Sequence, residues 1–213
     1  KNDIQLIQTR TNLKILDGRR VLIFFLPLVL NKIYKRLKED LKEKEVLIIS
    51  DDEKLTKEVI EALYKEIRFV TLVGDDENSI ENISKYILKK TGLSLFYSKN
   101  IDKILTNYSI IINLKDNTYI DINKIRKEAL LFDLSIEKGL CKIAENMRGV
   151  SVIEDFIFEI DIETKWIENI VSSNIYEYFC EFKPTDLRGL LVNGRVNTIE
   201  DFIDYEIRSK GKL

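Results

Sequence analysis

The stretch that decides the fold is VLIISDDEKLTKEVI, residues 46–60. Its first residues are aliphatic or β-branched, which is typical of a buried strand, and a short polar turn follows them. Beyond the turn, apolar residues recur four positions apart: Leu55, Val59, Leu63 and Ile67. This spacing predicts one apolar face of a helix over residues 53–67. The passage therefore predicts a strand, a polar turn and a helix.

The same alternation continues along the chain. Further strands are predicted at residues 68–73, 93–97, 109–114, 129–134 and 150–153. Between them, a helix begins near Asn78 or Ser79 and ends at Thr91-Gly92, and a short helix covers residues 101–105. Strands separated by helices imply parallel pairing with right-handed crossovers. We therefore predict an α/β fold with a doubly wound, mainly parallel Rossmann-like sheet over residues 45–160.

The two chain ends have a different pattern. Asp17-Gly18 and Asn193-Gly194 each lie between apolar runs, which predicts a hairpin over residues 13–24 and another over residues 190–197. We expect these hairpins to share a small antiparallel sheet, an additional module built from both ends. The apolar run Val21–Leu30 is interpreted as a core strand that leads into a helix over residues 28–41.

Helices are also expected over residues 161–181 and 198–208. The predicted division is residues 1–44, 45–160 and 161–213.

Composition limits the function. The 213 residues carry a net charge of −2, so we expect neither a nucleic-acid nor a membrane partner. The chain has no histidine, which removes the commonest general base at neutral pH and the commonest transition-metal ligand. Cys141 and Cys180 form no CxxC pair and suit a reducing compartment, so we expect a cytoplasmic protein. Small buried apolar roles are expected for both cysteines.

Candidate ligand residues lie where the predicted strands end, because parallel sheets bind ligands at their carboxyl edge. The candidate groove consists of Ser50, Asp51, Asp52, Gly74, Asp75, Asp76, Asn113, Lys115 and Asp133. Two interpretations of its acids stay open. Asp51 or Asp52 caps the following helix, or Asp51 and Asp52 hold a cation or an amine together with Asp75 and Asp76 from the neighbouring strand.

Part of this pattern resembles a known family. The segments RFVTLVGDDENSIENISKYI, SIIINLKDN and ALLFDLSIEKG are similar to the nucleotide-binding domain shared by shikimate dehydrogenase and glutamyl-tRNA reductase. The resemblance covers about residues 45–160 and implies a Rossmann-like NAD(P)-binding fold. In that family a glycine-rich turn follows the first strand, whereas this chain has SDDEKLT there. No counterpart of the reductase's nucleophilic cysteine or of the dehydrogenase's catalytic lysine–aspartate pair is found.

The departure from the family pattern disfavours NAD(P). Glycines let the backbone approach a pyrophosphate that sits on helix N-terminal amides, and side chains block that approach. Like charges about 4 Å apart also repel by about 1 kcal/mol in water and about 4 kcal/mol at an effective dielectric constant of 20. The sequence therefore leaves the cofactor unknown and predicts that Asp51, Asp52 and Glu53 exclude a dinucleotide.

Several hypotheses on function follow. We favour a degenerate, noncatalytic Rossmann-like protein that binds a non-dinucleotide ligand or a protein partner. The alternative is an NAD(P)-dependent oxidoreductase with a remodelled loop. A homodimer that forms through the terminal hairpins is compatible with the noncatalytic binding role.

Two further features bear on partners and on the acidic turn. The late aromatic segment (Trp166, Tyr176, Tyr178, Phe179 and Phe182) is a candidate partner surface, although Trp166 and Phe179 are expected in the core. The acidic turn also resembles a response-regulator receiver domain, but no phosphorylatable aspartate ends the third predicted strand.

Overall fold

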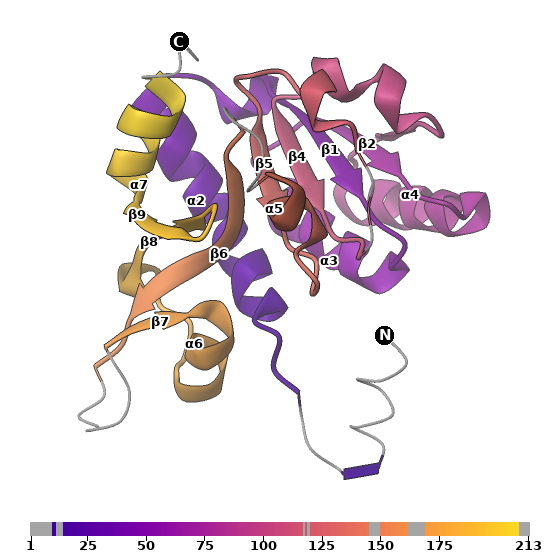
Figure 1. Ribbon diagram of the computed structural model, residues 1–213. Helices are drawn as coiled ribbons and strands as arrows, with labels where there is room; N and C mark the ends of the chain where they lie inside the picture. Colours follow the sequence, from indigo (N-terminus) through magenta and orange to yellow (C-terminus); the bar gives the residue numbers. More distant parts are fainter. Residues whose placement is uncertain are drawn as a thin grey trace.

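The computed structural model describes residues 10–11, 15–116, 118, 120–144, 150–161 and 169–208, with only the backbone described for residues 206–208. A parallel sheet in the order β3-β2-β1-β4-β5-β6 forms its centre. Its strands are β1 (Glu45–Ile49), β2 (Phe69–Val73), β3 (Leu95–Tyr97), β4 (Ile110–Asn113), β5 (Leu130–Asp133) and β6 (Val152–Glu159). This order confirms the predicted doubly wound, mainly parallel sheet (Figure 1).

Strand β6 continues well past β5. Its first residues pair in parallel with β5, and residues 157–159 pair antiparallel with β7 (Ile170–Ser172). Its other edge pairs antiparallel with β8 (Leu187–Val192), which pairs with β9 (Arg195–Thr198) through the turn at Asn193-Gly194. The predicted C-terminal hairpin is therefore confirmed, and it extends the main sheet.

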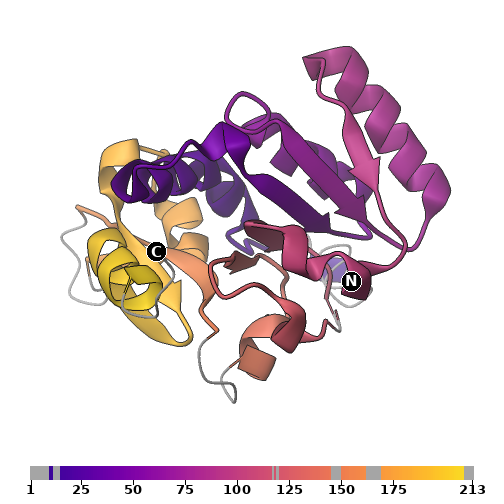
Figure 2. The ribbon, with the colours of Figure 1, turned by 90° about the horizontal axis from the view of Figure 1, so that it is seen from above.

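Helices cover the two faces of the sheet unequally (Figure 2). One face carries α2 (Arg19–Leu37), α3 (Glu53–Leu63) and α4 (Glu77–Thr91), with α6 (Ser173–Phe179) and α7 (Ile199–Asp201) packed against α2. The other face carries α5 (Gly139–Ala144) and short 3-10 segments. In the described ranges the 3-10 segments are Leu41–Glu43, Ile101–Lys103, Leu105–Asn107, Ile122–Lys124 and Pro184–Asp186. Helix α7 continues as a π-helix over Phe202–Arg208.

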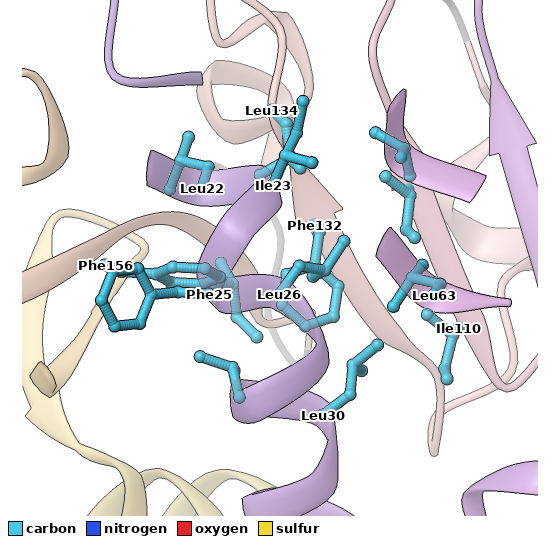
Figure 3. Close-up of a cluster of buried hydrophobic side chains, with 14 of the residues drawn as sticks. Leu22, Ile23, Phe25, Leu26, Leu30, Leu63, Ile110, Phe132, Leu134 and Phe156 are labelled. Atoms are coloured by element: carbon cyan, nitrogen blue, oxygen red, sulfur yellow. The ribbon is translucent and has the colours of Figure 1, made fainter. Parts of the chain in front are cut away.

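Helix α2 lies at the centre of the larger hydrophobic cluster. Phe25 and Leu26 are fully buried, and Figure 3 shows them between Phe156 of β6 and Leu63 of α3. The second, smaller cluster lies on the opposite face, under α5 and the 3-10 segments between residues 101 and 124. The central strands are therefore apolar on both faces, as their near-continuous apolar runs predict.

The predicted N-terminal hairpin is wrong. Residues 19–24 belong to α2, and Gly18 precedes that helix in a left-handed conformation (φ 75°). A Cβ at Gly18 would lie 2.1 Å from the Ser173 Oγ, so this glycine allows the start of α2 to approach α6. The run Val21–Leu30 is accordingly a buried part of a helix, even though Pro27 lies within it. Because almost every side of this segment is covered, it lacks the periodicity that distinguishes a helix from a strand.

The N-terminal helix α2 nevertheless meets the C-terminal part of the described chain, because it packs against α6 and α7. This contact is made through helices, so the small antiparallel sheet expected from two hairpins does not form. Residues 170–172, expected to be helical, form strand β7, and residues 162–168 lie outside the described part of the chain. The division at residues 44 and 160 stays a prediction.

Among the described residues, no helix combines the length and the apolar character needed to cross a bilayer.

Candidate functional site

The polar groups of the turn after β1 form hydrogen bonds with one another and with the start of α3. The Leu55 backbone N–H donates to the Asp52 carboxylate (3.1 Å), so Asp52 caps α3. The Asp52 N–H donates to the Ser50 hydroxyl (3.1 Å), which fixes the turn before the helix. Asp51 is exposed beside them. The capping interpretation of the acidic turn thus fits Asp52, whose carboxylate occupies an amide that a bound phosphate would need.

Gly74 at the end of β2 serves a close backbone contact. A Cβ there would lie 2.6 Å from the Ser50 carbonyl oxygen, and the Ser50 N–H donates to the Val73 carbonyl (3.0 Å). The ends of β1 and β2 therefore touch through the backbone, and Gly74 opens no space for a ligand between them.

An ion pair crosses the end of β1. Asp75 follows β2 and Lys115 follows β4, and β1 lies between these two strands. The Lys115 Nζ forms an ion pair with the Asp75 carboxylate above that strand end. Asp76 lies next to this pair and caps α4 by accepting from the Asn78 N–H (3.0 Å). The crevice at the switch in strand order is thus bridged by side chains of the protein itself.

A fully buried carboxylate, Asp133, organises the end of β5. Its Oδ1 accepts from the Asn113 Nδ2 (2.9 Å) and from the Ser135 hydroxyl (2.6 Å) and N–H (3.3 Å). Its Oδ2 accepts from the Leu140 N–H (2.9 Å) and from the Cys141 N–H (3.3 Å) and thiol (3.5 Å). Both oxygens are saturated by donors, which is how a buried carboxylate is stabilised.

Two further contacts tie the loops over strands β4 to β6. The Lys138 ammonium donates to the backbone carbonyls of Asp133 and Glu154, each at 2.7 Å. The Asp116 carboxylate accepts from the N–H groups of Ile136 (2.8 Å) and Glu137 (3.0 Å). The sequence analysis did not single out Lys138, because its contacts depend on a left-handed backbone (φ 52°) that the residue type does not indicate.

Neither cysteine is an activated nucleophile. Burial, followed by the neighbouring Asp133 charge, raises the pKa of the Cys141 thiol far above its usual range. Burial and Asp186 also raise the pKa of the Cys180 thiol. Both thiols are therefore protonated at neutral pH.

The positions of the candidate acids do not support the hypothesis that they bind a cation. Within the described ranges, no three histidine, cysteine, aspartate or glutamate side chains lie in a metal-binding arrangement. Asp52 is engaged with Leu55 and Asp75 with Lys115, so the candidate acids have separate partners.

The predicted site residues thus form three groups. Ser50, Asp52 and Gly74 shape the turns after β1 and β2, Asp75 and Lys115 bridge the crevice, and Asn113 and Asp133 join β4 to β5.

In the late aromatic segment, Tyr176 is buried, whereas the expectation that Phe179 is a core residue is wrong, because its side chain is 44% exposed. Trp166 lies outside the described residues.

The strand order, the crossovers and the position of the crevice define a Rossmann-like α/β protein. Solved structures with a fold similar to that of this chain include members of the two families named in the sequence analysis, shikimate dehydrogenase and glutamyl-tRNA reductase. Shikimate 5-dehydrogenase from Listeria monocytogenes, in complex with shikimate and NAD, matches at 15% identity over 60% of this chain and 50% of its own, with a TM-score of 0.44. Quinate dehydrogenase from Corynebacterium glutamicum, in complex with NAD, matches at 12% identity over 50% of this chain and 41% of its own, with a TM-score of 0.41.

The nucleotide-binding domain of glutamyl-tRNA reductase from Thermoplasma volcanium matches at 16% identity over 51% of this chain and 74% of its own, with a TM-score of 0.37. The chain therefore spans half or less of the length of the two dehydrogenases named above. No family model and no curated protein sequence matches it.

Proposed function

We propose that this protein is a noncatalytic, degenerate Rossmann-like protein that binds a non-dinucleotide ligand or a protein partner. The observation that carries the proposal is the ion pair between Asp75 and Lys115, which crosses the end of β1 where a dinucleotide would lie.

The acidic turn supports the same proposal. A pyrophosphate binds to bare amides at the N-terminus of the first helix, and here the Leu55 N–H already donates to Asp52. Asp51 and Asp52 add negative charge at the same place. The charge of Lys115 at this edge is balanced by Asp75, and the Lys138 ammonium is engaged by the carbonyls of Asp133 and Glu154. An anionic cofactor would therefore lose both its hydrogen-bond donors and its counter-charge.

The described side chains at this edge also argue against an acid–base pair for catalysis. Asp133 is saturated by hydrogen bonds, and the neighbouring Cys141 thiol has a raised pKa. The chain has no histidine to act as a base near pH 7. These features favour a binding role over the alternative, an NAD(P)-dependent oxidoreductase with a remodelled loop.

Calorimetric titration with NAD⁺, NADH, NADP⁺ and NADPH tests the proposal. We expect no dissociation constant below about 1 mM for any of them. Micromolar binding by the natural chain would refute the proposal and support the oxidoreductase. A variant with Ser50→Gly, Asp51→Gly and Asp52→Gly measures the contribution of the turn, and Asp121→Gly, a substitution away from this turn, is its control.

A cytoplasmic location belongs to this proposal. It rests on Cys141 and Cys180, which are both unpaired thiols in the structure. Cell fractionation that finds the protein in an oxidising compartment would contradict it.

A further inference from the structure

A cavity of about 510 Å³ opens at the far end of β6, away from the closed carboxyl edge of the shorter strands. The described residues around it come from β6, the end of α6 and the segment that leads into β8, a corner of the molecule that Figure 1 shows beside β7. Cavities of this size accommodate small ligands or the side chains of a bound peptide.

An apolar helix face borders this cavity. Ile175, Tyr178 and Phe179 are spaced three and four residues apart on α6 and therefore share one side of it. They are 37%, 71% and 44% exposed, and the rings of Tyr178 and Phe179 are in contact, with centroids 4.7 Å apart. Phe179 also lines the cavity. We call these three residues the α6 stripe.

A buried tyrosine holds the stripe and the cavity wall in place. Tyr176 stacks on Phe158 of β6, with ring centroids 4.2 Å apart. Its hydroxyl donates to the Asp186 carboxylate (2.7 Å), lies 3.0 Å from the Glu181 carbonyl and accepts from the Lys183 N–H (2.9 Å). Tyr176 therefore fixes the backbone of the cavity wall at Glu181 and Lys183 and the side chain of Asp186, which lowers the cost of ordering this surface on binding.

The described residues of the cavity wall carry a net negative charge. Glu159 is neutralised by its ion pair with Arg188. Of the remaining charged groups, Asp161, Glu181 and Asp186 are acidic and Lys183 is basic. Within the described part of the chain, Asp161 and Glu181 form no ion pair. A complementary ligand therefore carries positive charge beside apolar groups.

We infer that the cavity and the α6 stripe together bind a peptide segment of a partner protein that carries basic side chains next to large aliphatic ones. The aliphatic side chains cover the α6 stripe, and the basic ones enter the cavity and pair with Asp161 and Glu181. The inference rests on the proposed binding role, because it names the partner surface of that role.

Fluorescence anisotropy with defined peptides on the full chain tests the inference. The probe is a short labelled peptide of alternating leucine and arginine, and its matched control replaces every arginine with glutamate. We expect saturable binding of the basic peptide, at least about tenfold tighter than binding of the acidic one. High salt should weaken this binding, because it screens the attraction between the carboxylates and the arginines.

Surface variants locate the binding site. Tyr178→Ser with Phe179→Ser should weaken binding of the basic peptide by about tenfold or more, because exposed aromatic residues at an interface contribute most of its affinity. Asp161→Asn with Glu181→Gln should weaken it by about threefold or more and reduce its salt dependence. Phe96→Ser on β3, at the other end of the sheet, also removes an exposed aromatic residue and should leave binding within twofold.

Three outcomes would overturn the inference. The first is no binding of the basic peptide up to about 1 mM. The second is equal binding of both peptides, or equal losses for the Phe96→Ser control and the α6-stripe variant. The third is self-association in sedimentation that the α6-stripe variant abolishes, which would assign the surface to a second copy of this chain. Dinucleotide titration is a separate measurement, so the proposed function and this inference can fail independently.

Discussion

The carboxyl edge of β1 to β5 and the corner formed by β6, β7 and α6 contain similar residues but use them differently. At the edge, Asp133 and Asp52 bind donors of their own chain, and Asp75 pairs with Lys115. At the corner, Asp161 and Glu181 have no such ion-pair partner among the described residues, and aromatic rings face the solvent. The difference is that the described acids at the edge are bound by groups of the same chain, whereas Asp161 and Glu181 at the corner keep acceptor oxygens that a ligand could use.

The largest expected effect is at the closed edge, for Asp133→Asn. The amide nearly preserves the volume, but it brings N–H groups toward the donors on Leu140 or Ser135 that the carboxylate now binds. We expect a loss of about 3–5 kcal/mol in the free energy of unfolding, because several buried donors lose their acceptor. Urea denaturation followed by circular dichroism measures it.

Asp102→Asn is the matched control. Asp102 is exposed and lies 3.8 Å from the Lys124 ammonium, so the change should stay within about 0.5 kcal/mol. Similar midpoints for the two variants would contradict the view that Asp133 holds the edge together.

The second-largest loss of stability is expected for Gly74→Ala. The added methyl group would lie 2.6 Å from the Ser50 carbonyl oxygen, which is backbone and cannot move aside easily. We expect a destabilisation of about 1–3 kcal/mol, measured by thermal unfolding. Gly139→Ala serves as control because no atom lies within 4 Å of its added Cβ, and it should be neutral or slightly stabilising. If both alanines were tolerated equally, the ends of β1 and β2 would be less tightly joined than described.

Tyr176→Phe tests whether the hydroxyl of Tyr176 stabilises the corner formed by β6, β7 and α6. It keeps the ring on Phe158 but removes the hydroxyl that binds Asp186 and Lys183. We expect a loss of about 1–2 kcal/mol at pH 7 from chemical denaturation. Weaker peptide binding should accompany it, because the cavity wall loses its anchor. A fully neutral substitution would mean that the corner is held by other contacts.

The same variant has a pH signature. Burial raises the pKa of Tyr176 to about 12, whereas an unfolded tyrosine titrates near pH 10. The natural chain therefore loses stability as pH rises from about 10 to 12, because the unfolded state releases the proton first. The phenylalanine variant lacks this titration, so the stability difference between the two proteins should shrink over that range. A constant difference would show that the hydroxyl is not buried in solution.

The smallest expected effect is for Lys115→Met, which breaks the ion pair over β1. Because Asp75 is 80% exposed, the pair is screened by solvent, and we expect a loss of at most about 1 kcal/mol. Lys85→Met, which breaks the exposed pair with Glu81 on α4, is the control and should change stability by less than about 0.5 kcal/mol. A larger loss for Lys85 than for Lys115 would remove any special role of the bridging pair.

The parallel sheet could be predicted because its signals are local. Runs such as those of β1 and β4 are short, apolar and bounded by polar turns, and α3 and α4 have clear periodic faces. Helix α2 was misread because the run Val21–Leu30 is buried on most sides and has no such face. Asp17-Gly18 gave the same dipeptide signal as Asn193-Gly194, but Gly18 serves a contact with Ser173 that no local pattern encodes.

The candidate site was predicted only in part, for a similar reason. The rule that ligand residues follow parallel strands placed Asn113 and Asp133 side by side, and they are hydrogen-bonded. The other partners of Asp133 are Ser135 in the following loop and Leu140 and Cys141 at the start of α5, and contacts of Lys138 hold that loop in place. The exposure of Phe179 depends on how α6 packs, which its aromatic character does not reveal.

The continuity of β6 has a practical consequence for dissecting this protein. A cut after residue 160 would leave the strand intact but strip β8 from its edge, uncovering Phe156 and Phe158 and a row of unpaired amides. We therefore expect such a fragment to aggregate, because β7 and β8 pair with β6 and complete the sheet at its edges.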